Sequence, residues 1–406
     1  MTSSSSSPKQ GPPSVQVPPR TPSGKQPPGE LIADPKPKCR IGIFLTAANR
    51  NFMTFGGTTG VELFIAIANP KPTDTQTVKW SVVRGANDGN VRFDKSDQLI
   101  TRVFADKPNN TKVKVEIIEN GQSLCSAEAE ISVPQFFEVG RVSFTETFED
   151  LGFTATPDPK DSMAVKAAKA QLELDTIGLI NVGILDAAAR PFDGVNVRFV
   201  GKAPPAVLAK NVTSVALTEF RAATSNILGE AGLDVGNKDP NQTLEVYVAQ
   251  HGAEGSSPFG ALFRRVFNPI ARRYPAQKAG GRKKKAFGTP IQPGDVLIPP
   301  RPGNVRQLQV AAAIYALTQF LGATVAHEAG HSLGLVPGGA AGAAGKDASG
   351  HNAKPAGNIM DAATGFAVDT GIQRYDPKTG KLTRTKPAGF TAANLAILRK
   401  ILPVLG

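Results

Sequence analysis

About four fifths of the way along, the chain reads H-E-A-G-H from His327 to His331, and Gly334 follows. Residues four apart on an α-helix lie on the same face, so both imidazoles could reach one metal ion from adjacent turns. The chain has only four histidines, and at its own His and Glu frequencies this pattern would arise by chance roughly one time in a thousand. Glu328 lies between the two imidazoles in sequence, close enough to contact a water on the metal without binding the metal itself. The stretch therefore predicts a metal-binding helix with Glu328 as candidate general base.

The sequence before this motif favours a helix. From Val305 to Leu333 the chain is rich in Ala, Leu, Gln and Val and contains no proline. Gly322 interrupts the run, so a kink or a division into two helices is expected there. Gly334 is expected to end the helix, because glycine adopts the left-handed conformation found at helix C-termini.

The third ligand must come from outside the helix. A catalytic zinc ion takes three protein ligands and leaves one position for water. No glutamate follows Glu328, which excludes a third Glu ligand from downstream, and His351 is the one histidine beyond His331. We take His351 as the third ligand. The carboxylate alternatives are Asp347, Asp361, Asp369 and Asp376.

These residues resemble the metzincin family of zinc metalloproteases, whose pattern is H-E-x-x-H-x-x-G-x-x-H followed by a methionine turn, the Met-turn. Asn358-Ile359-Met360 matches that turn. The resemblance implies Zn²⁺ as cofactor and cleavage of protein or peptide substrates by a water that Glu328 activates. It implies these further roles: His327, His331 and His351 as ligands, Gly334 as the turning glycine and Met360 as an apolar floor under the metal.

The chain departs from the family pattern at one position. Pro337 stands where the third His is expected, and His351 follows a Gly/Ala-rich insert, residues 338–350. The insert is small and flexible in composition, so it could loop out and return His351 to the usual place. A polar cluster without metal, or a decayed site, is the alternative interpretation of the motif.

Length and composition predict a multidomain chain. Residues 1–38 are rich in Ser and Pro and are expected to be disordered. Residues 39–134 alternate in short strands and resemble an immunoglobulin-like β-sandwich, with Trp80 as candidate core. Residues 135–406 are expected to form an α+β catalytic domain of metzincin type, in three layers (α/β/α).

Hydrophobic periodicity gives the expected elements. In the first domain the expected strands are 40–45, 60–67, 77–83, 112–118 and 126–133. In the second, helices are expected at 161–174, 212–231 and 390–401, and strands at 194–200, 243–248 and 295–298.

The sequence also indicates where in or outside the cell the protein is expected. No run of about 18 unbroken apolar residues occurs, so no transmembrane helix is expected. The N-terminus lacks the basic and apolar regions of a secretory signal peptide, which predicts a cytoplasmic protein or one exported by another route. Cys39 and Cys125 are too few for a disulfide scaffold but allow one bridge.

The net charge of +12 is concentrated in two segments. Residues 1–38 carry +3 and residues 264–285 carry +9, so the rest is balanced. We interpret 264–285 as a solvated basic loop, with an anionic partner as the alternative; nucleic acid is the least favoured, although Phe263, Phe267 and Tyr274 lie in or beside it. His251 is interpreted as a surface or strand-end histidine.

The sequence thus favours a zinc-dependent endopeptidase. The rival hypothesis is a binding or adhesion protein, in which the β domain carries the function and the metal site is structural or inactive. Glu328 discriminates between them, because a structural site has no use for a carboxylate beside its ligands.

Overall fold

The computed structural model describes residues 41–45, 61–67, 75–83, 91–142, 146–156, 158–203, 210–219, 227–249, 266–272, 288–296, 299–336, 350–352, 358–361, 374–376, 378–379, 381–383 and 388–402. Several predictions fall outside these ranges. They concern the tail 1–38, Cys39, His251, Asp347, Asp369, most of the insert 338–350 and most of the basic stretch 264–285.

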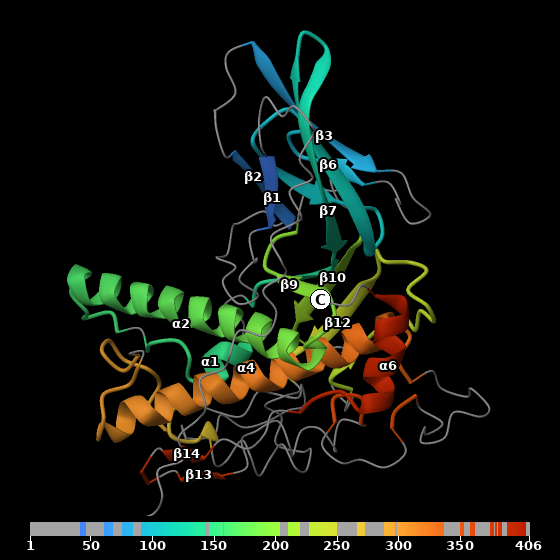
Figure 1. Ribbon diagram of the computed structural model, residues 1–406. Helices are drawn as coiled ribbons and strands as arrows, with labels where there is room; N and C mark the ends of the chain where they lie inside the picture. Colours follow the sequence, from blue (N-terminus) through green and yellow to red (C-terminus); the bar gives the residue numbers. More distant parts are fainter. Residues whose placement is uncertain are drawn as a thin grey trace, which may run out of the picture.

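Seven strands form the upper part of the molecule in Figure 1. They make two antiparallel sheets, of order β1-β2-β5-β4 and β3-β6-β7, around one apolar core. Trp80 is buried in that core, as expected, and its indole N–H donates to the carbonyl of Gln98 at 2.8 Å. The strands are β1 (Ile41–Leu45), β2 (Val61–Ile67), β3 (Gln76–Val83), β4 (Arg92–Phe93), β5 (Ile100–Phe104), β6 (Asn109–Glu119) and β7 (Gln122–Val133).

The sequence missed two strands of this region. The two-residue β4 is too short to show alternation, and β5 alternates over only five residues. Cys125 in β7 is disulfide-bonded. The chain's other cysteine, Cys39, lies outside the described residues.

Below these sheets lies a five-stranded mixed sheet of order β11-β12-β10-β8-β9. Four neighbouring strands run parallel, and β11 pairs antiparallel with β12 at the edge. This region is therefore mixed α/β, as expected. The strands are β8 (Gln135–Val139), β9 (Val197–Val200), β10 (Val212–Thr218), β11 (Gly229–Glu230) and β12 (Thr243–Tyr247).

Two predictions for this region are wrong. Residues 212–231, expected as a helix, contain β10 and β11 instead. The first seven are rich in Val and Thr, and Asn211, Thr213 and Val215 alternate as buried positions, so the period of two outweighs the apparent helical pattern. Asp295 and Val296, expected in a strand, are not in one: Asp295 accepts hydrogen bonds from the Gln292 backbone and from Arg306. The other half of that expected strand, residues 297–298, is outside the described ranges.

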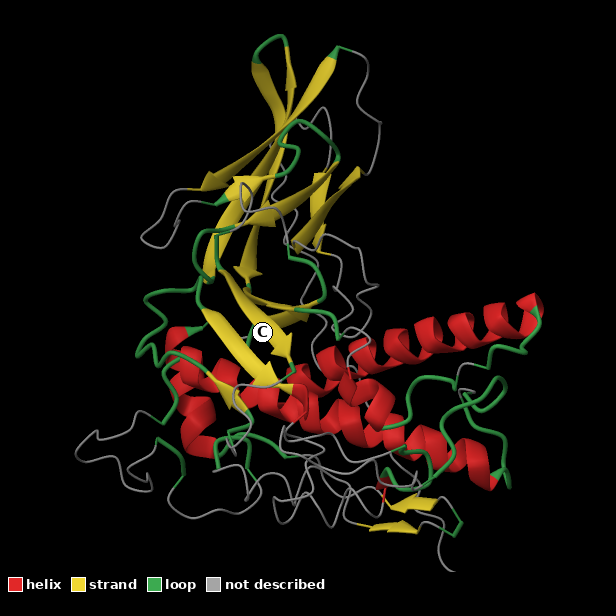
Figure 2. Cartoon of the chain, turned by 180° about the vertical axis from the view of Figure 1, so that it is seen from behind, coloured by secondary structure: helices red, strands yellow, loops and turns green. Residues whose placement is uncertain are grey.

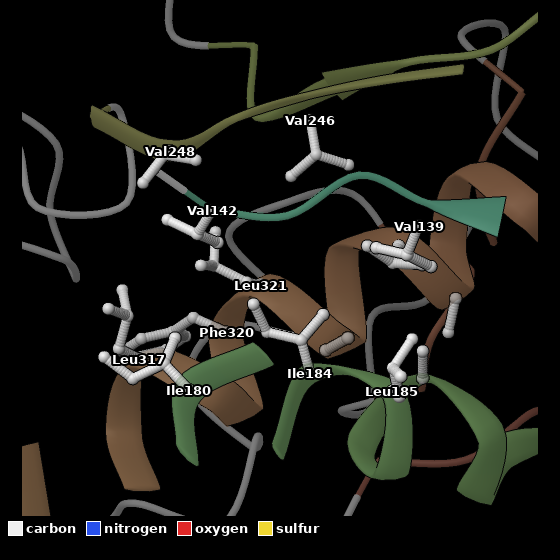
Figure 3. Close-up of a cluster of buried hydrophobic side chains, with 14 of the residues drawn as sticks. Val139, Val142, Ile180, Ile184, Leu185, Val246, Val248, Leu317, Phe320 and Leu321 are labelled. Atoms are coloured by element: carbon white, nitrogen blue, oxygen red, sulfur yellow. The ribbon is translucent and has the colours of Figure 1, made fainter. Parts of the chain in front are cut away.

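Two long helices, α2 (Met163–Ala189) and α4 (Val305–Ser332), lie side by side against the sheet (Figure 2). Ile184 on α2 and Leu321 on α4 face Val139 and Val246 on the strands (Figure 3). The remaining elements are α1 (Glu146–Asp150), a short 3₁₀ turn η1 (Arg190–Phe192), α6 (Ala392–Ile401) and the hairpin β13 (Arg374–Asp376) with β14 (Lys381–Thr383). The described helices share one core with one face of the sheet, so the described residues of this region form two layers, and the expected third layer is not among them.

Helix α4 is continuous through Gly322, so the expected division into two helices is wrong. A Cβ at Gly322 would lie 2.4 Å from the Cβ of Ala187 and 2.9 Å from the carbonyl oxygen of Ile184. The glycine therefore serves the close packing of α4 on α2. Among the described residues α4 is also the one helix long and apolar enough to cross a membrane, and most of it is buried inside the structure.

The described part of the basic stretch, residues 266–272, is not a solvated loop. Phe267, Ile270 and Ala271 are fully buried, and the ring of Phe267 packs edge-on against Phe153. Arg272 pairs with Glu149 at 2.8 Å. Because the short segment 266–272 contributes apolar side chains to the core, the interpretation as a loop is wrong there; Phe263 and Tyr274 are outside the described residues.

We expect Gly322→Ala to destabilise the protein by about 1–3 kcal/mol, because the added methyl overpacks the α2–α4 contact. Gly178→Ala is the matched control: it lies in α2 with open space around its Cβ position, and higher helix propensity should stabilise it by about 0.5–1 kcal/mol. Urea unfolding monitored by circular dichroism measures both. Equal stabilisation by the two substitutions would contradict the close packing.

Candidate metal centre

Three functional side chains lie near the C-terminus of α4, deep in the molecule. His327 and Glu328 are each 5% exposed, and His331 is one turn further along the same helix. The helix continues to Ser332 because its residues pack on α2 and on the sheet along most of its length. The helix therefore holds the backbone of His327, Glu328 and His331 in one conformation.

The helix ends as predicted, at Gly334. Its φ is +81°, and the N–H groups of Gly334 and Leu335 donate to the carbonyls of His331 (2.8 Å) and Gly330 (2.9 Å), which is a Schellman motif. A Cβ at Gly334 would also lie 2.7 Å from the carbonyl oxygen of Asp234. The turn thus needs glycine for its conformation and for the space.

The imidazoles of His327, His331 and His351 converge. Their ligand nitrogens all lie within 4.8 Å of one another. The Nε2 atoms of His327 and His331 are 3.1 Å apart. Two nitrogens bound to one zinc ion at about 2.0–2.1 Å in tetrahedral geometry are separated by about 3.3 Å, so this spacing fits a shared metal ion.

Hydrogen bonding orients these rings for ligation. Nδ1 of His327 lies 2.5 Å from the carbonyl oxygen of Ile359, which can only accept, so Nδ1 carries the proton and Nε2 is left with its lone pair. The ring of His331 likewise hydrogen-bonds the backbone of Leu335.

Burial keeps both helix imidazoles neutral, the form that binds metals. Burial, followed by the neighbouring His331 and His351, holds the pKa of His327 well below its usual value, against the opposing hydrogen bond to Ile359. Burial and then His351 lower the pKa of His331 to about 4, with the Leu335 contact opposing. The donor set of three imidazoles, two of them held neutral by burial, therefore fits Zn²⁺.

Met360 packs against the helix between His327 and His331. It is fully buried, and a Cβ at Gly330 would come within 2.5 Å of its Sδ atom. Gly330 occupies a variable position of the H-E-x-x-H pattern, and no sequence pattern singles it out. Its role follows from the contact: only a residue without a side chain lets the thioether reach the helix between the two ligands.

Glu328 is enclosed on the sheet side. A Cβ at Gly229 of the edge strand β11 would lie 2.6 Å from Oε1 of Glu328, so these two residues are in close contact. Burial, with a smaller contribution from Glu230, raises the pKa of Glu328 to about 8. Gly229 is a second residue that sequence reasoning missed, because its part in the site depends on a contact 99 positions away.

The structure brings together all six predicted site residues. Of the aspartate alternatives, Asp361 uses its carboxylate to bind Asn352 and Asn358, and Asp376 is exposed and accepts from Lys378 and Thr379. Neither belongs to the cluster of ligand atoms. His351 is therefore the third ligand candidate that the geometry supports.

Comparisons with protein-family models, curated proteins and solved structures found no match to this chain.

We expect His351→Ala to weaken Zn²⁺ binding by more than about 100-fold, because loss of a ligand should exceed the 10–100-fold typical of losing a residue that only orients one. Isothermal titration of metal-free protein measures the affinity. His251→Ala removes the chain's one histidine outside the motif region and is the matched control. Undiminished Zn²⁺ affinity in His351→Ala would indicate that a carboxylate, and not His351, is the third ligand.

Proposed function

We propose that this protein is a zinc-dependent endopeptidase, with a metzincin-like catalytic domain at 135–406 preceded by an immunoglobulin-like domain at 39–134. One observation carries the proposal: three convergent imidazoles lie next to a buried carboxylate at the edge strand β11 of the described sheet. The resemblance in H-E-x-x-H-x-x-G and in the Met-turn supports it further.

His327, His331 and His351 would hold the ion. A bound zinc ion supplies a Lewis acid that polarises a peptide carbonyl and makes a water more acidic. Glu328 takes one proton from the attacking water and passes it to the leaving amine nitrogen, so the peptide C–N bond breaks as the new C–O bond forms. The buried position of Glu328 and its raised pKa suit a group that must both accept and return a proton.

The edge strand β11 supports a peptide as substrate. It is the last strand of the sheet, and Gly229 in it lies against Glu328. An extended chain can add to a sheet edge through main-chain hydrogen bonds, which recognise peptide backbone whatever its side chains. A substrate bound there in extended form would pass beside the candidate general base.

The order of the upper strands supports the immunoglobulin-like proposal. Named A to G in chain order, the strands form the sheets A-B-E-D and C-F-G, which is the arrangement of constant-type domains. Trp80 lies on the third strand, where that fold places its buried tryptophan. The disulfide departs from the pattern: Cys125 is on the seventh strand, whereas antibody domains bridge the second and sixth.

The alternative is a binding protein whose metal site is structural. Its weakness is the energetic cost of Glu328, since burial of a carboxylate without an ion-pair partner is unfavourable unless function requires it. Among the described residues the group that shifts its pKa electrostatically is Glu230, another acid, which adds to that cost.

We expect Glu328→Gln to bind Zn²⁺ like the wild type and to lose about 10²–10⁴-fold in kcat, because an amide cannot accept the proton. Glu128→Gln, a partly exposed glutamate on β7, is the matched control and should cleave normally. Cleavage of denatured casein and of a peptide library, followed by mass spectrometry, measures activity.

Metal removal completes the test. A chelator should abolish wild-type cleavage, and stoichiometric Zn²⁺ should restore it. Zinc bound at one per chain, with no cleavage of either substrate, would favour the binding-protein alternative, and unchanged cleavage by Glu328→Gln would contradict the proposed role of this residue.

A further inference from the structure

His351 is the one candidate ligand that no helix holds. It follows Gly334 by a long insert and lies in the short described segment 350–352. Its ring nevertheless stacks on the ring of His327, with centroids 5.2 Å apart and an angle of 26°. Some contact must fix the backbone at this point.

The fixing contacts come from the residue next to it, Asn352. Its backbone N–H donates to the carbonyl of Met360 at 2.9 Å, and Asn352 pairs with Asp361 as a parallel β-bridge. The same pair is joined through its side chains, since Nδ2 of Asn352 donates to Oδ1 of Asp361 at 2.7 Å.

Asp361 binds the Met-turn with its other oxygen. Oδ2 accepts from the backbone N–H of Asn358 at 2.8 Å, and the N–H of Asp361 donates to the carbonyl of Asn358 at 3.1 Å. The residue is fully buried. One carboxylate thus ties the segment that carries His351 to the turn that carries Ile359 and Met360.

That turn is in contact with the helix at two points. The carbonyl of Ile359 accepts from the ring of His327, and Met360 packs against Gly330. A displacement of the turn would therefore move all three imidazoles relative to one another.

We propose that Asp361 is a positioning residue, which holds His351 at the metal site by joining Asn352 to the Met-turn. It is not itself a ligand, because both carboxylate oxygens accept hydrogen bonds within the segment. The inference rests on the zinc site of the proposed function and deepens it: the long insert is tolerated because the third ligand takes its place from the Met-turn.

An exchange of the two side chains tests this. Asn352→Asp sets two carboxylates against each other and should weaken Zn²⁺ binding by about 10–100-fold, the usual cost of losing a group that orients a ligand. The double variant Asn352→Asp with Asp361→Asn restores complementary bonding: the new amide donates to residue 352 and its carbonyl accepts from Asn358. It should recover wild-type affinity. Asp376→Asn changes an exposed aspartate that also closes a turn, and is the matched control.

Zinc affinity is measured by competition with a chromophoric chelator, and Co²⁺ absorption spectra report the ligand geometry. Thermal unfolding of the metal-free variants measures the fold separately. Loss of affinity in Asn352→Asp with recovery in the exchanged pair, at temperatures where all variants are folded, supports the proposal. Equal affinity in all variants, or no recovery in the exchanged pair, overturns it. No zinc binding by the wild type refutes the proposed function itself, and with it this inference.

Discussion

Helix α4 must serve two purposes at once, and the rest of the structure follows from this constraint. Most of its residues are buried in the core between α2 and the five-stranded sheet, yet it carries two imidazoles and a carboxylate that are costly to bury. A buried polar group without a partner costs about 1–3 kcal/mol, so each must find one. The first imidazole finds the carbonyl of Ile359 and the second finds the backbone of Leu335. The two segments that contain Leu335 and Ile359 are thereby held against the helix.

The same constraint explains the glycines along the helix. Gly322 lets α4 approach α2, Gly330 admits the thioether of Met360, and Gly334 lets the chain turn back. Glycine inside a helix costs about 0.5–1 kcal/mol relative to alanine, so its use at two interior positions indicates contacts worth more than that. Each of these contacts brings a neighbouring segment closer to α4 than a Cβ would allow.

The parts predictable from sequence are those that depend on local spacing. The i, i+4 imidazoles, the helix from Val305 and its glycine end follow from helical geometry alone, and His351 follows from the scarcity of histidine. The errors arise where tertiary contacts decide. The strand β10 mixes Val and Thr with residues that also suit a helix, and Phe267 lies among arginines that mark a surface loop by composition. The contacts of Gly229 and Gly330 depend on partners far away in sequence, which no local pattern reveals.

The position of His351 follows from which part of the site is rigid. Where a short turn connects the helix to the third ligand, the helix itself fixes the position of that ligand. Here residues 338–350 separate the third imidazole from the helix in sequence, so helical geometry does not fix its position. The described contacts next to it are the bonds among Asn352, Asn358 and Asp361. A buried carboxylate suits this task, because it can accept from both sides and is strongly penalised when either bond is lost. On this proposal, an imidazole separated from the helix by the insert depends on the carboxylate of Asp361, the residue after Met360.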